Sequence, residues 1–284
     1  MSRRLVRGVL VAGLLAVAAL SAWSRPLTAP LPEGVYLEEM TWVELRELIQ
    51  GGATTVIVPT GGIEQGGPHL VTGKHNYIVR HTAGRIAESL GGTLVAPVIA
   101  YVPEGDIESR EGHMAFAGTI SLPEPVFAAV LENTARSLRA HGFRVIAFLG
   151  DSGGNQASQA AVAEKLNIEW AGSGVRVIHV GDYYDPEANG QIAWLQDQGE
   201  SRGSIGSHAG IRDTSELMAV YPAGVRSDRI AWGGGFFTEN TGVIGDPTKA
   251  SAERGKVMLE LKVEAALRQI RAELGRAGLG GADS

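Results

Sequence analysis

The sequence predicts a single-domain, three-layer α/β/α fold built around a mostly parallel sheet. Continuous apolar runs, such as residues 144–149 (RVIAFL), are typical of strands that are buried on both faces. Amphipathic helical segments separate these runs along the chain, which is the element order of a parallel sheet covered on both sides. The sequence shows no repeat and no clear linker, so we expect one α/β domain over residues 41–275.

Helices are expected where apolar residues recur every three or four positions. Thr41 and Glu44 are spaced as a capping box and mark the start of the first helix, whose apolar face includes Trp42. The other expected helices cover residues 76–90, 123–140, 155–170 and 215–220, followed by a C-terminal helix with apolar positions from 259 to 274. Asp213 or Thr214 is the expected cap of the helix at 215–220.

Four strands are expected between these helices. They cover residues 54–58, 93–100, 144–149 and 175–180. Pro97 cannot donate to a ladder, so the second run is expected at a sheet edge or at a strand end. Because ligands in open α/β sheets bind at the carboxyl ends of the strands, we expect the functional side chains in the loops that follow them.

Composition excludes several classes of protein. The 284 residues contain 25 Lys and Arg against 31 Asp and Glu, a formal net charge of -6, which argues against a nucleic-acid partner. The chain has no cysteine, so disulfides, zinc–thiolate sites and a cysteine nucleophile are excluded.

The N-terminus has the layout of a secretory signal. Three arginines precede an uncharged run over residues 8–23, and Ala22 and Ser24 offer the small residues that a signal peptidase reads. We therefore expect a signal peptide over residues 1–24, a leader segment over 25–40, and a periplasmic or secreted protein without a stable membrane span. An uncleaved N-terminal membrane anchor is the alternative. Residues 276–284 are expected to form a flexible tail.

Two polar, glycine-rich segments follow predicted strands. Residues 59–75 bring together Glu64, His69 and His75, whose carboxylate and imidazole groups are typical ligands of hydrolytic zinc or manganese. Residues 150–155 (GDSGGN) match G-x-S-x-G, in which a strand-to-helix turn exposes a nucleophilic serine, here Ser152. The same turn is equally consistent with a pocket wall at a helix N-terminus.

Two further segments carry candidate site residues. Residues 207–216 contain His208 and Asp213, and Asp182 and His208 follow Ser152 in the chain order used by hydrolases with a serine elbow. His113, in the segment 111–113, is a weaker candidate for the wall of a pocket.

Five segments, in this order, resemble the motifs of the creatininase (creatinine amidohydrolase) family. Residues 62–70 (GIEQGGPHL) are similar to the family's G-x-x-E-Q-H-G-P-H-L, and residues 116–122 (FAGTISL) to its F-P-G-T-x-S-L. Residues 141–155 begin with HGFR and end with GGN, as the family's H-G-[FA]-R and N-G-H-G-G-N do. Residues 208–215 (HAGIRDTS) resemble H-A-G-x-x-E-T-S, and residues 245–248 (GDPT) also fit. The resemblance implies an α/β amidohydrolase, usually a homo-oligomer, that uses two divalent metals to activate water.

The resemblance also shows where this chain departs from the family's ligands. Glu64 and the catalytic histidine, His208, are retained. Gly66 stands where the family has its next histidine ligand, and His75 replaces the bridging aspartate. Ser152 replaces the histidine of N-G-H-G-G-N. Loss of a bridging carboxylate removes the charge that holds two dications together, so a dinuclear centre is not expected.

One divalent ion, Zn, Mn or Fe, remains compatible with the sequence. Glu64, His75 and Asp213, which replaces the family's glutamate, are the expected ligands, with Asp151 as a fourth. His208 would then position or relay a proton during hydrolysis of a C–N amide bond, possibly that of a cyclic amide, in a small-molecule substrate.

Two other interpretations stay open. A metal-free serine hydrolase would use Ser152 with His208 as its base. A catalytically silent relative would bind a small molecule in the same pocket. In every case His69, His113 and Asn155 are candidate residues of the substrate pocket, and a homo-oligomer is expected.

Overall fold

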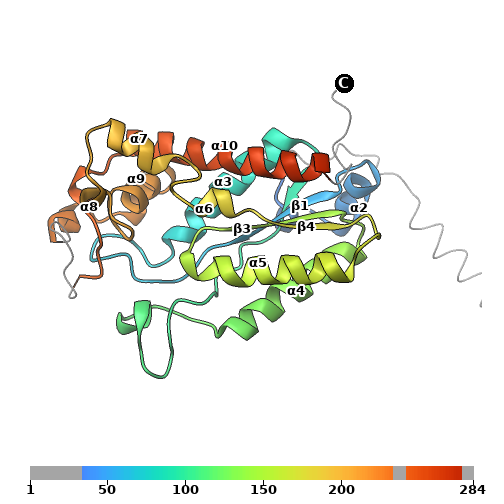
Figure 1. The fold of residues 1–284 in the computed structure, drawn as a ribbon, viewed down its shortest axis with the longest axis horizontal. Coiled ribbons are helices and arrows are strands. Elements are labelled where there is room, and N and C mark those ends of the chain that lie inside the picture. The colour runs from blue at the N-terminus through green and yellow to red at the C-terminus, as the bar shows by residue number, and fades with distance from the viewer. Residues whose placement is uncertain (1–33, 233–240, 277–284) are drawn as a thin grey trace, which may run out of the picture.

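Four parallel strands form the centre of the computed structural model, which describes residues 34–232 and 241–276 (Figure 1). Their order is β2-β1-β3-β4. The strands are β1 (Thr55–Thr60), β2 (Thr93–Val95), β3 (Val145–Gly150) and β4 (Arg176–His179). Val56 lies opposite Ile146 in the register of β1 and β3. The predicted signal peptide lies outside the described residues, as does most of the tail.

Helices cover both faces of this sheet, as the apolar runs predicted. The longer ones are α2 (Trp42–Gln50), α3 (Lys74–Leu90), α4 (Glu124–Ala140), α5 (Gly153–Glu169), α9 (Ile211–Val220) and α10 (Ala252–Arg276). The short ones are α6 (Gly181–Tyr184), α7 (Gln191–Asp197) and α8 (Arg202–Ile205). Five 3₁₀ turns, η1 to η5, span Leu37–Glu39, Gly112–Ala115, Pro222–Gly224, Ser227–Trp232 and Pro247–Lys249. The three-layer α/β/α fold is thereby confirmed.

Alternate residues of each strand supply two separate cores. Val56 and Val58 of β1 pack with α2, α4 and α5, whereas Ile57 between them packs with α3 and α10. Figure 1 shows α4 and α5 on one side of the sheet and α3 and α10 on the other. Because both faces are covered, nearly every strand position is apolar, and this produced the continuous runs in the sequence.

Several local expectations are confirmed. Thr41 caps α2, and a capping box forms because the Glu44 carboxylate accepts the Thr41 backbone N–H at 2.7 Å. Pro97 follows an edge strand, but β2 ends at Val95, five residues before the end of the predicted run.

Other expectations are wrong. Trp42 is 62% exposed, because α2 places Leu45, Leu48 and Ile49, and not Trp42, against the core. α9 begins at Ile211, so Asp213 and Thr214 lie inside its first turn and Gly210 is its N-cap. Residues 35–40, predicted as part of the leader, pack against the sheet through Val35, Tyr36, Leu37 and Met40.

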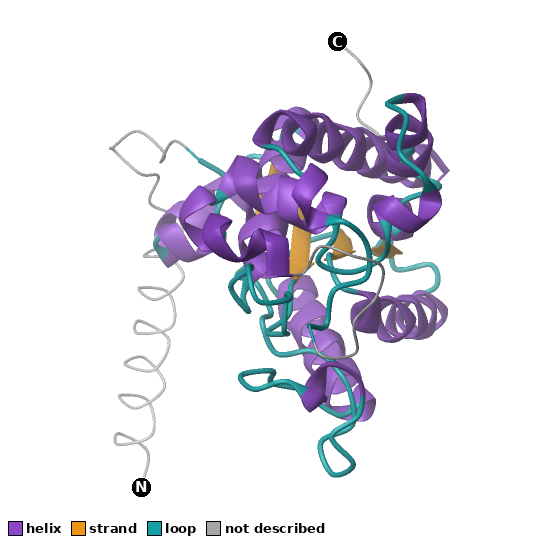
Figure 2. Cartoon of the chain, turned by 90° about the vertical axis from the view of Figure 1, so that its left-hand side faces the viewer, coloured by secondary structure: helices purple, strands orange, loops and turns teal. Residues whose placement is uncertain are grey.

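The carboxyl ends of the strands face one crowded side of the molecule. Figure 2 looks onto that side, where loops and short helices lie in front of the sheet. The loop after β1 and the N-terminus of α5 after β3 meet here, together with α9 and α10. None of the helices in the described ranges is long and apolar enough to span a bilayer.

Candidate functional site

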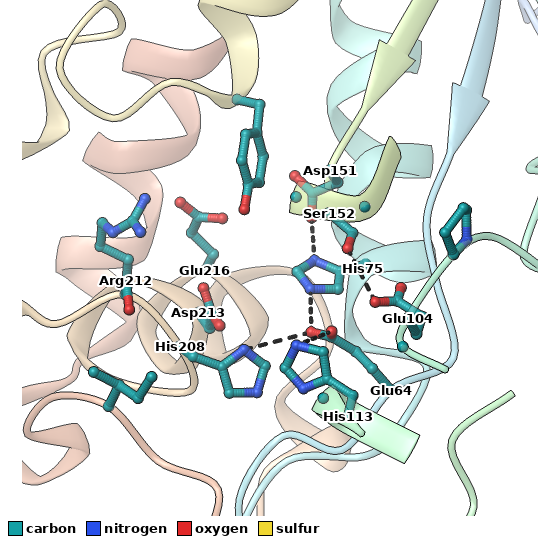
Figure 3. A pocket seen from close by; sticks show the side chains of 18 of the residues that line it. Glu64, His75, Glu104, His113, Asp151, Ser152, His208, Arg212, Asp213 and Glu216 are labelled. Atoms are coloured by element: carbon teal, nitrogen blue, oxygen red, sulfur yellow. Dashed lines mark hydrogen bonds and ion pairs between the residues drawn. The ribbon is translucent and has the colours of Figure 1, made fainter. Parts of the chain in front are cut away.

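A cavity of about 570 Å³ lies at the carboxyl ends of β1 and β3. Its walls come from the loop after β1, the loop that carries Glu104 and His113, the N-terminus of α5, and the inner faces of α9 and α10. Figure 3 shows the side chains around it, with Glu64, His75, His113 and His208 drawn close together. Segments that lie far apart in the sequence therefore converge on one pocket.

Glu64 is the centre of this cluster and is only 2% exposed. Its Oε1 accepts hydrogen bonds from the Lys74 ammonium and from His75 Nε2, the latter at 2.8 Å. Its Oε2 lies 3.0 Å from His113 Nε2. Burial alone raises the pKa of Glu64, but the charges of Lys74 and His75 outweigh it and hold that pKa well below its usual value. Glu64 is therefore a carboxylate.

His75 bridges two buried carboxylates. Its Nδ1 lies 2.8 Å from Asp151 Oδ2, and its Nε2 faces Glu64. Burial and the Lys74 charge lower the pKa of His75, yet Glu64 and Asp151 more than offset them and raise it to about 9. Both ring nitrogens are thus occupied by hydrogen bonds to carboxylate oxygens, each at 2.8 Å. The structure thus places His75 as a hydrogen-bond donor rather than as the expected ligand.

A second buried group of charges lies beside the first. Lys262 of α10 donates to Asp151 Oδ1 and, at 3.1 Å, to Glu216 Oε2. The Tyr183 hydroxyl also donates to Asp151 Oδ1 at 2.8 Å. With His75 on its other oxygen, Asp151 accepts three hydrogen bonds from protein groups. The structure therefore pairs Asp151 with Lys262, Tyr183 and His75, and Asp151 does not belong to the group of ligand atoms described below.

His113 and His208 are the neutral bases of the pocket. Burial lowers the pKa of His208 to about 4, and it also lowers the pKa of His113. The two rings lie 4.4 Å apart between centroids. His208 Nδ1 is 3.6 Å from Glu64 Oε1. Each ring therefore has one unprotonated nitrogen at neutral pH.

Glu64, His113 and His208 form a candidate metal site. Among the residues that the structure describes, they make up the one group of three such side chains whose ligand atoms all lie within 4.8 Å of one another. Bonds of about 2.1 Å to a tetrahedral ion place neighbouring ligand atoms about 3.4 Å apart. His113 Nε2 lies 3.0 Å from Glu64 Oε2, and His208 Nδ1 lies 3.6 Å from the other oxygen, Oε1, so both contacts are near that value. The donor set, two imidazoles and one carboxylate, fits a single hydrolytic ion.

Asp213, the third expected ligand, lies on the cavity wall but outside this group. Its Oδ2 accepts the backbone N–H of Ala209 at 2.8 Å. Burial raises the pKa of Asp213, and Lys74 and the nearby histidines lower it further than burial raises it. Asp213 thus contributes charge to the pocket and holds the turn that carries His208.

Ser152 does not form the expected pair with His208. Its hydroxyl donates to Glu104 Oε2 at 3.3 Å, and Figure 3 shows it on the far side of His75 from His208. Its backbone is extended, with φ -118° and ψ 153°, and so lacks the strain of a nucleophile elbow. The geometry therefore does not support a serine nucleophile at this turn.

Glu104 is an acid that the sequence analysis missed. It is 4% exposed, and its Oε1 is buried without a hydrogen-bond partner. Burial, and then the negative charge of Glu64, raise its pKa to about 8. Glu104 is thus a carboxyl group of the cavity whose raised pKa favours the protonated form at neutral pH.

Two expected pocket residues hold the scaffold instead. Asn155 donates to the Thr60 and Gly61 carbonyls and to the Thr60 hydroxyl, which fixes the end of β1. His69 is fully buried and lies 2.9 Å from the Thr214 hydroxyl, which ties the loop after β1 to α9. Neither residue lines the cavity.

His69 should make the fold sensitive to acid. Burial lowers its pKa from 6.5 to about 4, so below pH 6.5 the unfolded chain takes up a proton that the folded chain refuses. At about 1.4 kcal/mol per pKa unit, we expect this residue to lower the free energy of unfolding by about 3 kcal/mol as the pH falls from 6.5 to 4. Urea unfolding of His69→Gln should show a smaller acid loss than the parent. The same change at exposed His141 should leave the acid loss unaltered.

Comparison with known proteins identifies the relatives of this fold. The family model described as creatinine amidohydrolase matches residues 38–270. The chain belongs to the creatininase family. A mycofactocin precursor peptide peptidase from Mycolicibacterium smegmatis is 28% identical over 221 residues, which cover 71% of this chain and 78% of that protein. The creatinine amidohydrolase of Pseudomonas putida is 25% identical over 262 residues, covering 86% and 98% of the two chains.

Solved creatininases share the fold. The structure described as "Creatininase Mn" superposes with a TM-score of 0.68 at 25% identity and covers 85% of this chain and 99% of its own. A variant creatininase of the Zn-Zn type gives a TM-score of 0.64 at 25% identity, with the same coverage. Creatininase-family members hydrolyse amide or peptide bonds, so the chain is assigned to a family of hydrolases with metal-bound relatives.

Proposed function

We propose that this member of the creatininase family hydrolyses an amide bond with one divalent ion, Zn, Mn or Fe, held by Glu64, His113 and His208. The observation that carries the proposal is the convergence of these three ligand atoms within 4.8 Å on the wall of the cavity. One carboxylate and two neutral imidazoles are the ligand set expected of a catalytic zinc site with an open position. When bound, such an ion supplies a Lewis acid and an acidified water.

The chain's own residues would prepare the other parts of the reaction. Lys74 and His75 keep Glu64 ionised and fix its orientation. Glu104 holds a proton at neutral pH on a carboxyl group that lines the cavity, and we assign to it the protonation of the leaving nitrogen. Each role uses a group whose protonation state follows from its buried neighbours.

The rest of the pocket argues for one ion rather than two. Asp151 and Glu216 are already paired with Lys262, and His75 is charged. A second dication among them would require a fixed charge to be removed.

For the substrate we propose a small molecule or a short peptide with an amide bond. The cavity of about 570 Å³ falls within the usual range for small-molecule sites. Both a creatinine amidohydrolase and peptide peptidases occur among the relatives. On the strength of the N-terminal sequence, we also propose that the chain is exported after cleavage following Ser24, and a homo-oligomer is proposed because the family resemblance implies one. Mass spectrometry of the exported chain, expected to begin at Arg25, tests the cleavage.

Chelation separates the metal-dependent hydrolase from a serine hydrolase. On a panel of cyclic amides and short peptides, we expect activity that a chelator abolishes and that Zn²⁺ or Mn²⁺ restores. Ser152→Ala should keep the rate within about tenfold, because the serine acts only through its bond to Glu104. Chelator-resistant activity that is lost in Ser152→Ala would establish the serine mechanism. Ligand binding without turnover, with or without metal, would identify a silent relative.

A further inference from the structure

Lys262 occupies an unusual position for a lysine. It lies in the middle of α10, on the face formed by Met258, Leu259, Val263 and Ala266, all of which are buried. Its own side chain is only 6% exposed, and it lines the wall of the cavity. Lysine is almost never buried to this degree unless it is paired.

The Lys262 ammonium is shared by two carboxylates from different parts of the fold. Asp151 follows β3, and Glu216 belongs to α9, so a single cation joins the sheet, α9 and α10. Of the other partners of the two acids, Gln191 and Tyr183 are neutral, and His75 belongs to the cluster around Glu64. Gln191 donates to Glu216 Oε1 at 2.7 Å, and Tyr183 and His75 donate to Asp151.

Two buried carboxylates that face one point stay ionised together only when a cation lies between them, because without it one of them takes up a proton. Carboxylate oxygens, with or without an imidazole, are also the ligands that Zn²⁺ and Mn²⁺ accept. In this chain an amino group covalently attached to α10 fills the point where those oxygens meet.

We propose that the Lys262 ammonium takes the place of a divalent cation between Asp151 and Glu216, and that removing it opens a metal site there. The inference does not rest on the ion proposed at Glu64, because Asp151 and Glu216 are not members of that group. The cation between Asp151 and Glu216 is thus part of the polypeptide. It cannot be removed by chelation, and it keeps other cations out.

Metal content of Lys262→Gln tests this proposal. The glutamine is neutral and retains hydrogen-bond donors for the two acids. After equilibration with Zn²⁺ or Mn²⁺ and removal of free metal, we expect this variant to hold one more ion per chain than the wild type. Its thermal midpoint should rise by several degrees when either ion is added. The thermal midpoint of the wild type should rise only as far as binding at the proposed Glu64 site accounts for.

Two control variants distinguish the loss of the positive charge at Lys262 from the loss of a lysine side chain elsewhere on the helix. Lys262→Arg keeps the charge and should gain no ion. Lys256→Gln removes an exposed lysine of the same helix and should also gain none. A Lys262→Gln variant with the wild-type number of ions and no stabilisation by metal would overturn the proposal.

Folding of the variant is itself informative. If Lys262→Gln folds only when Zn²⁺ or Mn²⁺ is present, the ion has replaced the ammonium and the proposal is supported. Failure to fold under both conditions contradicts it, as does a wild-type chain that holds two ions. A wild type without any ion would instead refute the proposed function, and it would leave the comparison between wild type and variant intact.

Discussion

Glu64→Gln is expected to reduce kcat/KM for the fastest amide of the panel by at least about a thousandfold and to lower the metal content from one ion per chain to almost none. The amide is isosteric but neutral, so it removes the one negatively charged ligand of the proposed ion. It also leaves Lys74 and His75 with one carboxylate fewer among their partners. Metal analysis and steady-state kinetics on the same preparation measure both effects.

A surface glutamate provides the matched control for this change. Glu260 lies on α10 with 45% of its side chain exposed and pairs with Arg85, so Glu260→Gln should retain activity and metal. A Glu64→Gln variant that keeps its ion and more than about a tenth of its activity would show that the ion is held elsewhere.

Lys74→Met is expected to destabilise the metal-free chain by about 3 to 5 kcal/mol, because it leaves a buried carboxylate without one of its counter-charges. Lys74 is fully buried in the first turn of α3, and its ammonium donates directly to Glu64. Urea unfolding at pH 7 in the presence of a chelator measures this loss. The double variant with Glu64→Gln should recover a large part of it, because the unpaired charge is then gone.

An exposed ion pair gives the comparison. Lys165 lies 2.7 Å from Glu132 and is 59% exposed, so Lys165→Met should cost no more than about 1 kcal/mol. Equal losses in the two lysine variants, or a double variant no more stable than Lys74→Met, would show that Lys74 and Glu64 are not strongly coupled.

The fold could be predicted because its signals are local. Residues 144–149 are apolar throughout since both faces of β3 are covered, and the stripe on α3 repeats with the period of a helix. The short helices α6, α7 and α8 were missed, because segments of four to seven residues carry too few turns for a periodic pattern. The start of α9 was missed because its cap is Gly210, which offers no side-chain signal.

The site could be predicted in part. The motif segments located Glu64, Asp151, Ser152, His208 and Asp213 on one pocket, since their loops and helix N-termini lie at one edge of the sheet. Pairing within the pocket was not predictable, because it depends on which side chains meet in three dimensions.

The buried lysines were missed because lysine is normally a surface residue. The sequence does contain a signal for Lys262, which falls on the same helical face as Leu259 and Ala266. A charged residue at a core position of an amphipathic helix indicates a buried partner of opposite charge. Glu104 gave no such signal, because it lies in an irregular loop outside every motif.

Anomalous diffraction from crystals of the mature chain, recorded at the absorption edge of the bound metal, tests the central claim most directly. We predict a single peak per chain, within bonding distance of Glu64, His113 and His208, about 2.0 to 2.2 Å from each ligand atom. A crystal grown with excess Zn²⁺ or Mn²⁺ that shows no peak at these residues would contradict the proposed hydrolytic site. A peak bound to His75 or Asp213 would contradict the ligand assignment.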